Sequence, residues 1–324
     1  MRQWASTFTE WFERYTFFII PASLILGFIA SDAPQPFISW APYLFGYVTM
    51  VMALGCGITH LKKVAARPWP LALVLILSHA VAPLIAYGLG VVLFGAESDY
   101  TIGLVLFTVI PLGVSSVLWV GISGGNVPFM LAMVVLDSAL SPIVVPGLIE
   151  IFFGTQIAFD SIALMKDLLI IVVVPTVIGV ILYELSKGKI KVWSAPVTQP
   201  ISKLAFMMVV TLNAAAIAPS LQTLRSDMVI IVPIVIALVA FHYILGFFGS
   251  DLLKQRSREM RVTFAYGVGM RNISLGMVLA MSYFSPKASV PVVLAIMIQQ
   301  PMATLFQAWV KRRLPLSPSG LGQD

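Results

Sequence analysis

The sequence predicts an all-α, polytopic membrane protein, and its composition and hydropathy carry that prediction. Of the 324 residues, 59% are hydrophobic and only 10% are charged, and the mean hydropathy is +0.96. Soluble domains average roughly 25% charged residues, whereas a helix that spans a bilayer needs about 20 apolar residues. Apolar stretches fill nearly the whole chain, so we expect many spans and no sizeable soluble domain.

Proline, glycine and clustered charges divide the apolar sequence into ten segments. The ten predicted spans cover residues 16–31, 40–58, 69–95, 101–123, 127–149, 164–184, 200–219, 228–250, 262–284 and 289–310. Residues 1–15 place aromatic side chains near helical spacing among polar ones, which is typical of an amphipathic helix in the membrane interface. Residues 314–324 form a predicted cytoplasmic tail.

Basic residues indicate the orientation of these spans. With a cytoplasmic N-terminus, sixteen of the twenty lysines and arginines fall in cytoplasmic segments, and only Lys166, Arg225 and Lys287 fall outside. The remaining one, Arg271, falls within a span. The positive-inside rule therefore predicts both termini in the cytoplasm. We expect the protein in the inner (plasma) membrane. The net charge of +6 follows from this topology, so we expect no nucleic-acid partner.

Composition and motifs argue against an enzyme. The chain has one cysteine, Cys56, and three scattered histidines, so neither a disulfide framework, a metal site nor a cofactor is expected. The HExxH, GxSxG and P-loop patterns do not occur in the sequence.

The two halves of the chain resemble each other. VPFMLAMVVLDSALSP, from Val127, aligns with VPVVLAIMIQQPMATL, from Val290, at an offset of 163 residues. The same offset places His79 opposite His242. The alignment predicts an internal repeat of five helices.

We therefore divide the chain into a first repeat, residues 16–158, and a second, residues 159–313. Because each repeat has an odd number of helices, the two copies must have inverted topology. Inverted repeats are typical of alternating-access transporters, whose site lies at the midplane where broken helices of the two copies meet. In this alignment Asp137 lies opposite Gln300.

Three segments carry a resemblance to a known family. FHYILGFFGSDLLK from Phe241, YGVGMRNISLGMVLA from Tyr266 and PLGVSSVLWVGISGGNV from Pro111 resemble the bile acid:sodium symporter family, and the resemblance extends from about Met50 to Trp309. It implies a panel domain of helices 1, 2, 6 and 7 and a core domain of helices 3 to 5 and 8 to 10. It also implies that helices 4 and 9 are broken where they cross, and that organic anions are carried with two sodium ions.

The chain departs from this family where the family holds sodium. The family's Ser-Asn in helix 4 corresponds to Ser116-Val117, and two hydroxyl residues of helix 5 correspond to Met130 and Val134. The family's Glu-x-Gly-Met-Gln-Asn reads GVGMRN from Gly267, so the carboxylate is lost and an amide becomes Arg271. We therefore expect a divergent, bacterial-type member that does not bind sodium at the usual sites.

Asp137 is the only acidic residue, and Arg271 the only basic residue, predicted deep inside a span. Each lies about 15 to 16 Å from the cytoplasmic end of its helix, near the middle of a core roughly 30 Å thick. Three hypotheses stay open: Arg271 replaces sodium as a fixed cation with Asp137 as its partner, Arg271 binds the anionic group of the cargo, or Asp137 exchanges a proton. His79, at similar depth, is either a proton relay to Asp137 or a buried, hydrogen-bonded histidine.

Several residues are expected at the crossing of helices 4 and 9. Pro111 and Gly113 in helix 4, with Gly267 and Gly269 in helix 9, are expected to open the backbone there, although helix packing is an alternative role for each glycine. The polar side chains expected to line the crossing are Ser115, Ser116 and Asn272.

The sequence thus predicts a secondary active transporter of a small organic anion, bile-acid-like or another carboxylate or sulfonate, which works by alternating access. We expect Arg271, Asn272, Ser115, Ser116, Gly113 and Gly269 at the substrate site, and Asp137, Arg271 and His79 in ion coupling or a charge pair. The transporter is expected to be proton-coupled or a uniporter. The alternatives are a sodium symporter with rebuilt ion sites and a non-transporting anion sensor or channel. Lipid and the anion are the expected partners, and the sequence does not determine the oligomeric state.

Overall fold

The computed structural model describes residues 2–154, 160–221, 227–253 and 257–314. Within these ranges the regular structure is helical, apart from one isolated β-bridge between Leu112 and Arg271. The predicted boundary between the repeats at 158–159 and the tail beyond Leu314 lie outside the described residues. The elements are α1 (Arg2–Ile29), η1 (Gln35–Trp40), α2 (Ala41–Ala53), α3 (Ile58–Ala65), α4 (Pro68–Ile76), η2 (Leu77–Val81), α5 (Ala82–Phe94), α6 (Asp99–Val109), α7 (Ser116–Ile122), α8 (Val127–Phe153), α9 (Ser161–Leu168), η3 (Leu169–Val173), α10 (Val174–Leu185), α11 (Lys189–Leu221), α12 (Met228–Gly249), η5 (Ser250–Leu252), α13 (Arg258–Gly269), α14 (Ile273–Tyr283) and α15 (Pro286–Arg313).

Six of the described helical segments are long and apolar enough to cross a membrane, or seven if the bent pair formed by η1–α2 and α3 counts as one span. The six are Pro68–Phe94, Val127–Phe153, Ser161–Leu185, Lys189–Ala216, Met228–Leu252 and Pro286–Arg313. The prediction of an all-helical, polytopic membrane protein is confirmed at this level.

The other three predicted spans coincide with apolar helices of 10 to 17 residues. These are the Phe18–Ile29 part of α1, together with α6 and α14. The latter two are short because the chain breaks within the predicted spans 101–123 and 262–284. α1 itself is continuous across residue 15, where we predicted a change from an interfacial helix to the first span.

Two spans contain a π-helical turn, and a proline explains both. η2 is followed by Pro83, and η3 is followed by Pro175. Proline has no N–H to donate to the residue four positions earlier, so the helix accommodates it by widening a turn. η2 therefore holds Ser78 and His79 in a part of the helix where backbone carbonyls lose their usual partners.

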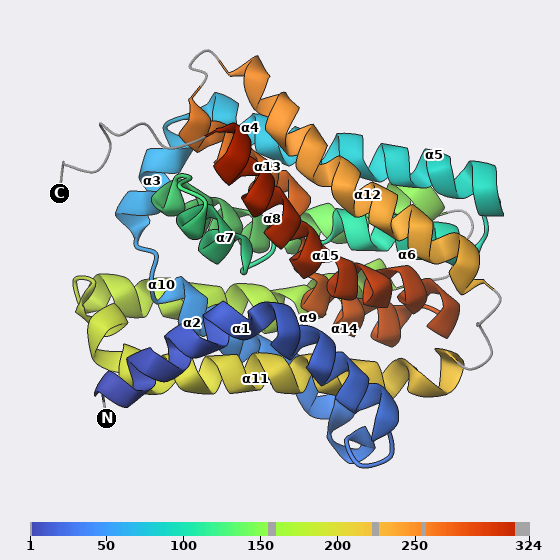
Figure 1. The fold of residues 1–324 in the computed structure, drawn as a ribbon, viewed down its shortest axis with the longest axis horizontal. Coiled ribbons are helices and arrows are strands. Elements are labelled where there is room, and N and C mark those ends of the chain that lie inside the picture. Colours follow the sequence, from blue (N-terminus) through green and yellow to red (C-terminus); the bar gives the residue numbers. More distant parts are fainter. Residues whose placement is uncertain (1, 155–159, 222–226, 254–256, 315–324) are drawn as a thin grey trace.

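Figure 1 shows the helices in two layers. One layer contains α1, α2, α10 and α11, with α1 packed along α11 and with α2 against α10 and α11. The other contains α4, α5, α12, α13 and α15 together with α6 to α8. In this second layer α12 packs along α13, and α6 packs against α5 and α15. The layers meet where α14 and α15 contact α11.

Candidate functional site

The break between α6 and α7 meets the break between α13 and α14. The N–H of Gly113 donates a hydrogen bond of 2.9 Å to the carbonyl of Met270, and the N–H of Asn272 donates one of 2.8 Å to the carbonyl of Pro111. The two interrupted helices are therefore joined by a short stretch of antiparallel backbone. Their opened backbone groups must find partners because they are buried.

Side chains from α8 and α15 satisfy the backbone of the two bridged residues. Asp137 in α8 accepts the N–H of Leu112 at 2.7 Å. Gln299 in α15 accepts the N–H of Arg271 at 2.8 Å and donates to its carbonyl at 3.1 Å. A side chain of the long helix that follows each break therefore stabilises that break.

Two of the four residues expected to open the backbone do lie in a break. Pro111 and Gly113 fall between α6 and α7, and a Cβ added to Gly113 would come within 2.7 Å of the carbonyl oxygen of Arg271. Glycine is thus required at position 113, because the two backbones approach too closely for a side chain to fit between them. Gly267 and Gly269 remain helical, as the last turn of α13, so that expectation is wrong for them. A Cβ at Gly269 would meet the ring of Tyr243 at 2.7 Å, which makes it a packing glycine.

Asp137 is paired with His79. Nε2 of His79 lies 2.7 Å from Oδ1 of Asp137, and the two residues are 8% and 1% exposed. No ion pair joins Asp137 to Arg271, although both belong to the described residues and their charges interact at longer range. The carboxylate therefore lies between His79 and the N–H of Leu112.

The Arg271 side chain reaches α4–α5. Its Nη2 atom donates a hydrogen bond of 2.8 Å to the carbonyl of Ser78, in the π turn η2. The N–H of Ala82 there bonds to Leu77 instead of Ser78. In the π pattern the Ser78 carbonyl would accept from residue 83, which is a proline and has no N–H. The π turn thus leaves a carbonyl without a helical donor, and Arg271 supplies one.

Several buried polar atoms around Arg271 have no hydrogen-bond partner among the described residues. Both ring nitrogens of His242, Nδ1 of His79, Oγ of Ser78 and the Nε and Nη1 atoms of Arg271 belong to this group. Buried polar atoms are rarely left unpaired, and ordered water or an ion usually accounts for them. The surroundings of Arg271 are therefore polar and able to hold water.

A cavity of about 490 Å³ lies between the two helix layers and extends to the bridged breaks. Three of the residues expected at the substrate site, Gly113, Ser115 and Asn272, border this cavity. Ser116 does not line it, because its hydroxyl is buried and donates to the carbonyl of Gly113 at 2.6 Å. Arg271 borders the cavity but is only 1% exposed, and its guanidinium is directed to a carbonyl outside the lining.

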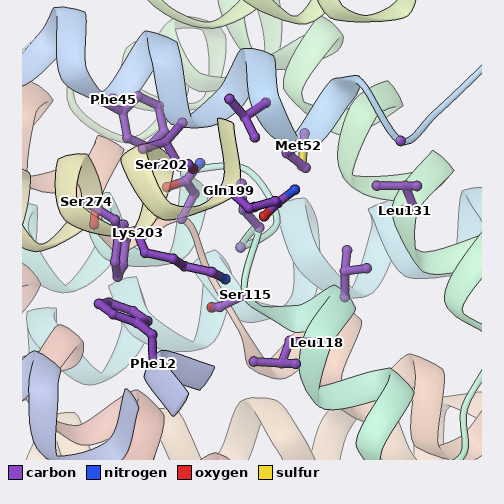
Figure 2. A pocket seen from close by; sticks show the side chains of 18 of the residues that line it. Phe12, Phe45, Met52, Ser115, Leu118, Leu131, Gln199, Ser202, Lys203 and Ser274 are labelled. Carbon is purple, nitrogen blue, oxygen red and sulfur yellow. The ribbon is translucent and has the colours of Figure 1, made fainter. Parts of the chain in front are cut away.

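The structure adds lining residues that the sequence analysis did not select. Figure 2 shows Gln199, Ser202 and Lys203, which come from α11, and Phe12, which comes from α1. Lys203 was assigned to a cytoplasmic segment, but it lies within the candidate span Lys189–Ala216. The statement that Arg271 is the only basic residue deep in a span is therefore wrong.

The residues at the expected sodium positions do not fit sodium. Met130 and Val134 are 1% and 0% exposed and offer no hard oxygen ligand. A Cβ at Gly267 would lie 3.6 Å from the Sδ atom of Met130, so a thioether borders the position of the missing carboxylate. The Ser116 hydroxyl already donates to a backbone carbonyl. Sodium prefers oxygen ligands and compensating negative charge, which these side chains do not supply.

Comparison with known proteins places the chain in a family. The sequence profile of the Sodium Bile acid symporter family matches residues 43–224. The chain is 31% identical to the Bacillus subtilis (strain 168) protein YbaS, described as uncharacterized, over 301 residues that cover 93% of this chain and 97% of that one. It is 26% identical over 273 residues to the uncharacterized sodium-dependent transporter YocS of the same organism, covering 82% of this chain and 81% of that one. It is also 26% identical over 277 residues to the probable sodium/metabolite cotransporter BASS1, chloroplastic, of Oryza sativa subsp. japonica. This match covers 82% of this chain and 65% of that one. The chain belongs to the sodium bile acid symporter family and is a membrane transporter, not an enzyme.

Proposed function

We propose that the chain is a secondary active transporter that moves a small organic anion by alternating access. The observation that carries the proposal is the charge of the cavity between the two layers. Lys191, Lys203 and Arg271 border it, and no acidic residue occurs among its described lining residues. A cavity of about 490 Å³ is within the usual size range of small-molecule sites. A basic, partly apolar cavity of this size favours an anionic cargo with a carboxylate or sulfonate group.

The fold proposed for this function is ten spans arranged as two inverted five-helix repeats. Asp137 on α8 and Gln299 on α15 support this arrangement, because each bonds to the N–H of a bridged residue in its own half of the chain. The sequence alignment places Asp137 opposite Gln300, whereas the hydrogen bond that supports the proposed equivalence comes from Gln299, one residue earlier. In this account the layer of α1, α2, α10 and α11 is the panel domain and the other layer is the core domain.

The cavity opens toward one side of the membrane in this account. Its lining reaches Gly55 just after α2, Ile122 at the end of α7 and Lys191 at the start of α11. These helix ends face the cytoplasm in the predicted topology, in which both chain termini are cytoplasmic. The structure then corresponds to the inward-facing state, and the plasma membrane is the expected location.

Arg271 serves as a resident cation in this proposal. Its guanidinium is buried between α13 and the π turn η2, where it bonds to the Ser78 carbonyl rather than facing the cavity. Of the three hypotheses for Arg271 and Asp137, this geometry favours the fixed cation over direct binding of the cargo. Asp137, bonded to His79, is the proposed protonatable group if transport is coupled to protons.

A sodium-coupled symporter with rebuilt ion sites is the second candidate function. The names of relatives favour it, since YocS and the plant BASS proteins are named as sodium-dependent or sodium/metabolite transporters. Such a protein would need oxygen ligands at other positions, because the side chains of Met130, Val134 and Gly267 contain no oxygen.

Counterflow in proteoliposomes tests the proposal. The compound used is a carboxylate or sulfonate that raises the melting temperature of the purified protein. Vesicles that contain the protein are loaded with the unlabelled compound and are then diluted into a trace of the labelled compound. A carrier accumulates label transiently. Each binding site that releases unlabelled anion outside can return with labelled anion, and the unlabelled anion inside competes with the label for exit. Equilibration without an overshoot would indicate a channel, and no uptake would indicate a sensor, so either result contradicts the proposal.

A further inference from the structure

An apolar groove lies between α12 and α15, on the outer surface of the second layer. Figure 1 shows these two helices crossing on one outer face of the molecule. The groove has a volume of about 290 Å³, and all of its lining residues are apolar or aromatic residues of α12 and α15. It shares no lining residue with the cavity between the layers. The groove is therefore a separate feature of the membrane-facing surface.

Aromatic rings give the groove its depth. Tyr243 and Phe247 are buried beneath it, and the ring of Phe247 packs against that of Trp309 with 5.1 Å between the centroids. Phe248 of α12 and Leu305 of α15 also line the groove and are 60% and 64% exposed. Buried rings below exposed side chains from both helices form a hollow that can receive an apolar chain.

The length and depth of the groove match one leaflet of a bilayer. At 1.5 Å per residue, it extends about 12 Å along α12, from Ala240 to Phe248, and about 10 Å along α15, from Met302 to Trp309. One leaflet contributes about 15 Å of hydrocarbon, half of a core roughly 30 Å thick. The groove occupies the last turns of both helices, which end on the cytoplasmic side in the predicted topology. It thus has room for part of an acyl chain of the cytoplasmic leaflet.

Three exposed cations follow the groove at the end of α15. Lys311, Arg312 and Arg313 form the last turn of that helix. Arg312 and Arg313 come three and four residues after Trp309, so they continue the same side of the helix about one turn further on. Within the described part of the chain, no ion pair or hydrogen bond involves these three side chains. The apolar groove therefore ends beside positive charge that the protein itself does not neutralise.

This charge distinguishes between a lipid and a second copy of the chain as the occupant. A symmetric dimer formed through the groove would place the same surface of each copy at the interface. The cations of one copy would then lie against those of the other and repel them. A phospholipid with a negatively charged headgroup instead supplies an apolar chain for the groove and the opposite charge for the cations.

We propose that the groove binds one acyl chain of an anionic phospholipid whose phosphate lies against Arg312 and Arg313. A guanidinium binds phosphate through paired N–H donors, which makes arginine well suited to this contact. Trp309 lies between the apolar groove and the cations, at the depth where tryptophan is enriched in membrane proteins. The site does not depend on the proposed transport function, because its residues lie outside the central cavity.

Quenching of Trp309 fluorescence by brominated lipids tests the site. The full-length protein is reconstituted in phosphatidylcholine vesicles that contain increasing fractions of either phosphatidylglycerol or phosphatidylcholine with brominated acyl chains. Because the chain has seven tryptophans, the contribution of Trp309 is the difference between the wild type and Trp309→Phe. Brominated phosphatidylglycerol should reach half-maximal quenching at a fraction at least about fivefold lower than brominated phosphatidylcholine does.

Charge variants separate the headgroup contact from general contact with lipid. Arg312→Gln combined with Arg313→Gln should reduce the preference for phosphatidylglycerol to less than about twofold, because the contacts with the phosphate are lost. Arg312→Lys combined with Arg313→Lys should retain most of the preference. Lys62→Gln combined with Lys63→Gln is the matched control and should leave the preference unchanged. It removes two exposed charges from α3, on the same predicted side of the membrane but outside the groove.

A second variant tests the groove itself, in case the double arginine variant does not fold. Ala240→Phe fills the groove and leaves all three cations in place, so it should weaken quenching of Trp309 by brominated phosphatidylglycerol at least about twofold. Equal quenching by the two lipids in the wild type, or an unchanged preference without the two arginines, would overturn the anionic-lipid site. Quenching by neither lipid would also overturn it, since protein such as a second copy would then cover the groove.

Discussion

Nη2 of Arg271 donates a 2.8 Å hydrogen bond to the carbonyl of Ser78, which lies 193 residues earlier in the chain. The bond exists because two local features meet. The α13–α14 break brings Arg271 to the interior, and the π turn before Pro83 frees the carbonyl. The Arg271 side chain is therefore held by a backbone carbonyl that a regular helix would not offer.

Removing the charge of Asp137 should be less harmful when Arg271 is also neutral. Asp137→Asn keeps an acceptor for the N–H of Leu112 but leaves a buried guanidinium without its nearby negative charge. We expect it to lower the free energy of unfolding by about 2 kcal/mol, and the double variant with Arg271→Gln to lose less. Melting temperatures of the purified proteins check this. A double variant less stable than either single one would show that the two charges do not act together.

Gln299 should matter more for stability than for binding. Its amide satisfies both the N–H and the carbonyl of Arg271, and Gln299→Leu leaves these two buried groups unpaired. Each unpaired group costs roughly 1–3 kcal/mol, so the melting temperature should fall markedly. Gln307→Leu, at a less buried position on the same helix, is the control and should change it little. Equal melting temperatures of Gln299→Leu and the wild type would mean that water replaces the amide as the partner of these two groups.

Gly113→Ala should separate the two helix breaks. The added Cβ would meet the carbonyl oxygen of Arg271 at 2.7 Å, and backbone on both sides prevents relief by a side-chain rotation. Transport in proteoliposomes should fall by about 5- to 100-fold, which corresponds to the usual cost of overpacking, about 1–3 kcal/mol. Gly88→Ala is the control, because a Cβ at Gly88 meets no atom within 4 Å and alanine favours a helix. Wild-type transport by Gly113→Ala would contradict the need for this close approach.

Tyr283→Phe should loosen the contact between α14 and the span Ser161–Leu185, which begins with α9 and includes α10, on the side away from the cavity mouth. The Tyr283 hydroxyl, at the end of α14, donates to the carboxylate of Asp167 in α9 at 2.5 Å. Its loss should favour the opposite-facing state and increase labelling by a membrane-impermeant thiol reagent of Ser274→Cys, made with Cys56→Ala, from the outer side. Unchanged labelling would show that this bond does not hold the layers together.

Local chemistry explains which features of the site were predictable from the sequence. Pro111 and Gly113 indicated the first break because both disfavour a regular helix, and Asn272 was placed at the second because it matches a family motif. The partner of Asp137 was not predictable, since depth along a helix does not reveal which way a side chain points. Moreover, the N–H of Leu112 becomes available only once the helix is broken.

Lys203 was misplaced for a related reason. The predicted span 200–219 begins at Pro200, only three residues before Lys203, whereas α11 contains Pro196 and Pro200 without a break and runs from Lys189 to Leu221. Membrane helices tolerate internal proline when neighbouring groups satisfy the freed carbonyls. The polar residues recurring every three or four positions from Lys191 were the pattern that could have shown this face of the helix.

The measurement that tests the central claim most directly is the thermal shift of the wild-type protein with 2-naphthoate in sodium buffer and in choline buffer. In the proposed mechanism Arg271 takes the place of a coupling cation, and the cavity supplies its own positive charge. We therefore expect the same dissociation constant in both buffers. Stabilisation that occurs only with sodium would contradict the account and would show that the chain is a sodium symporter with rebuilt ion sites.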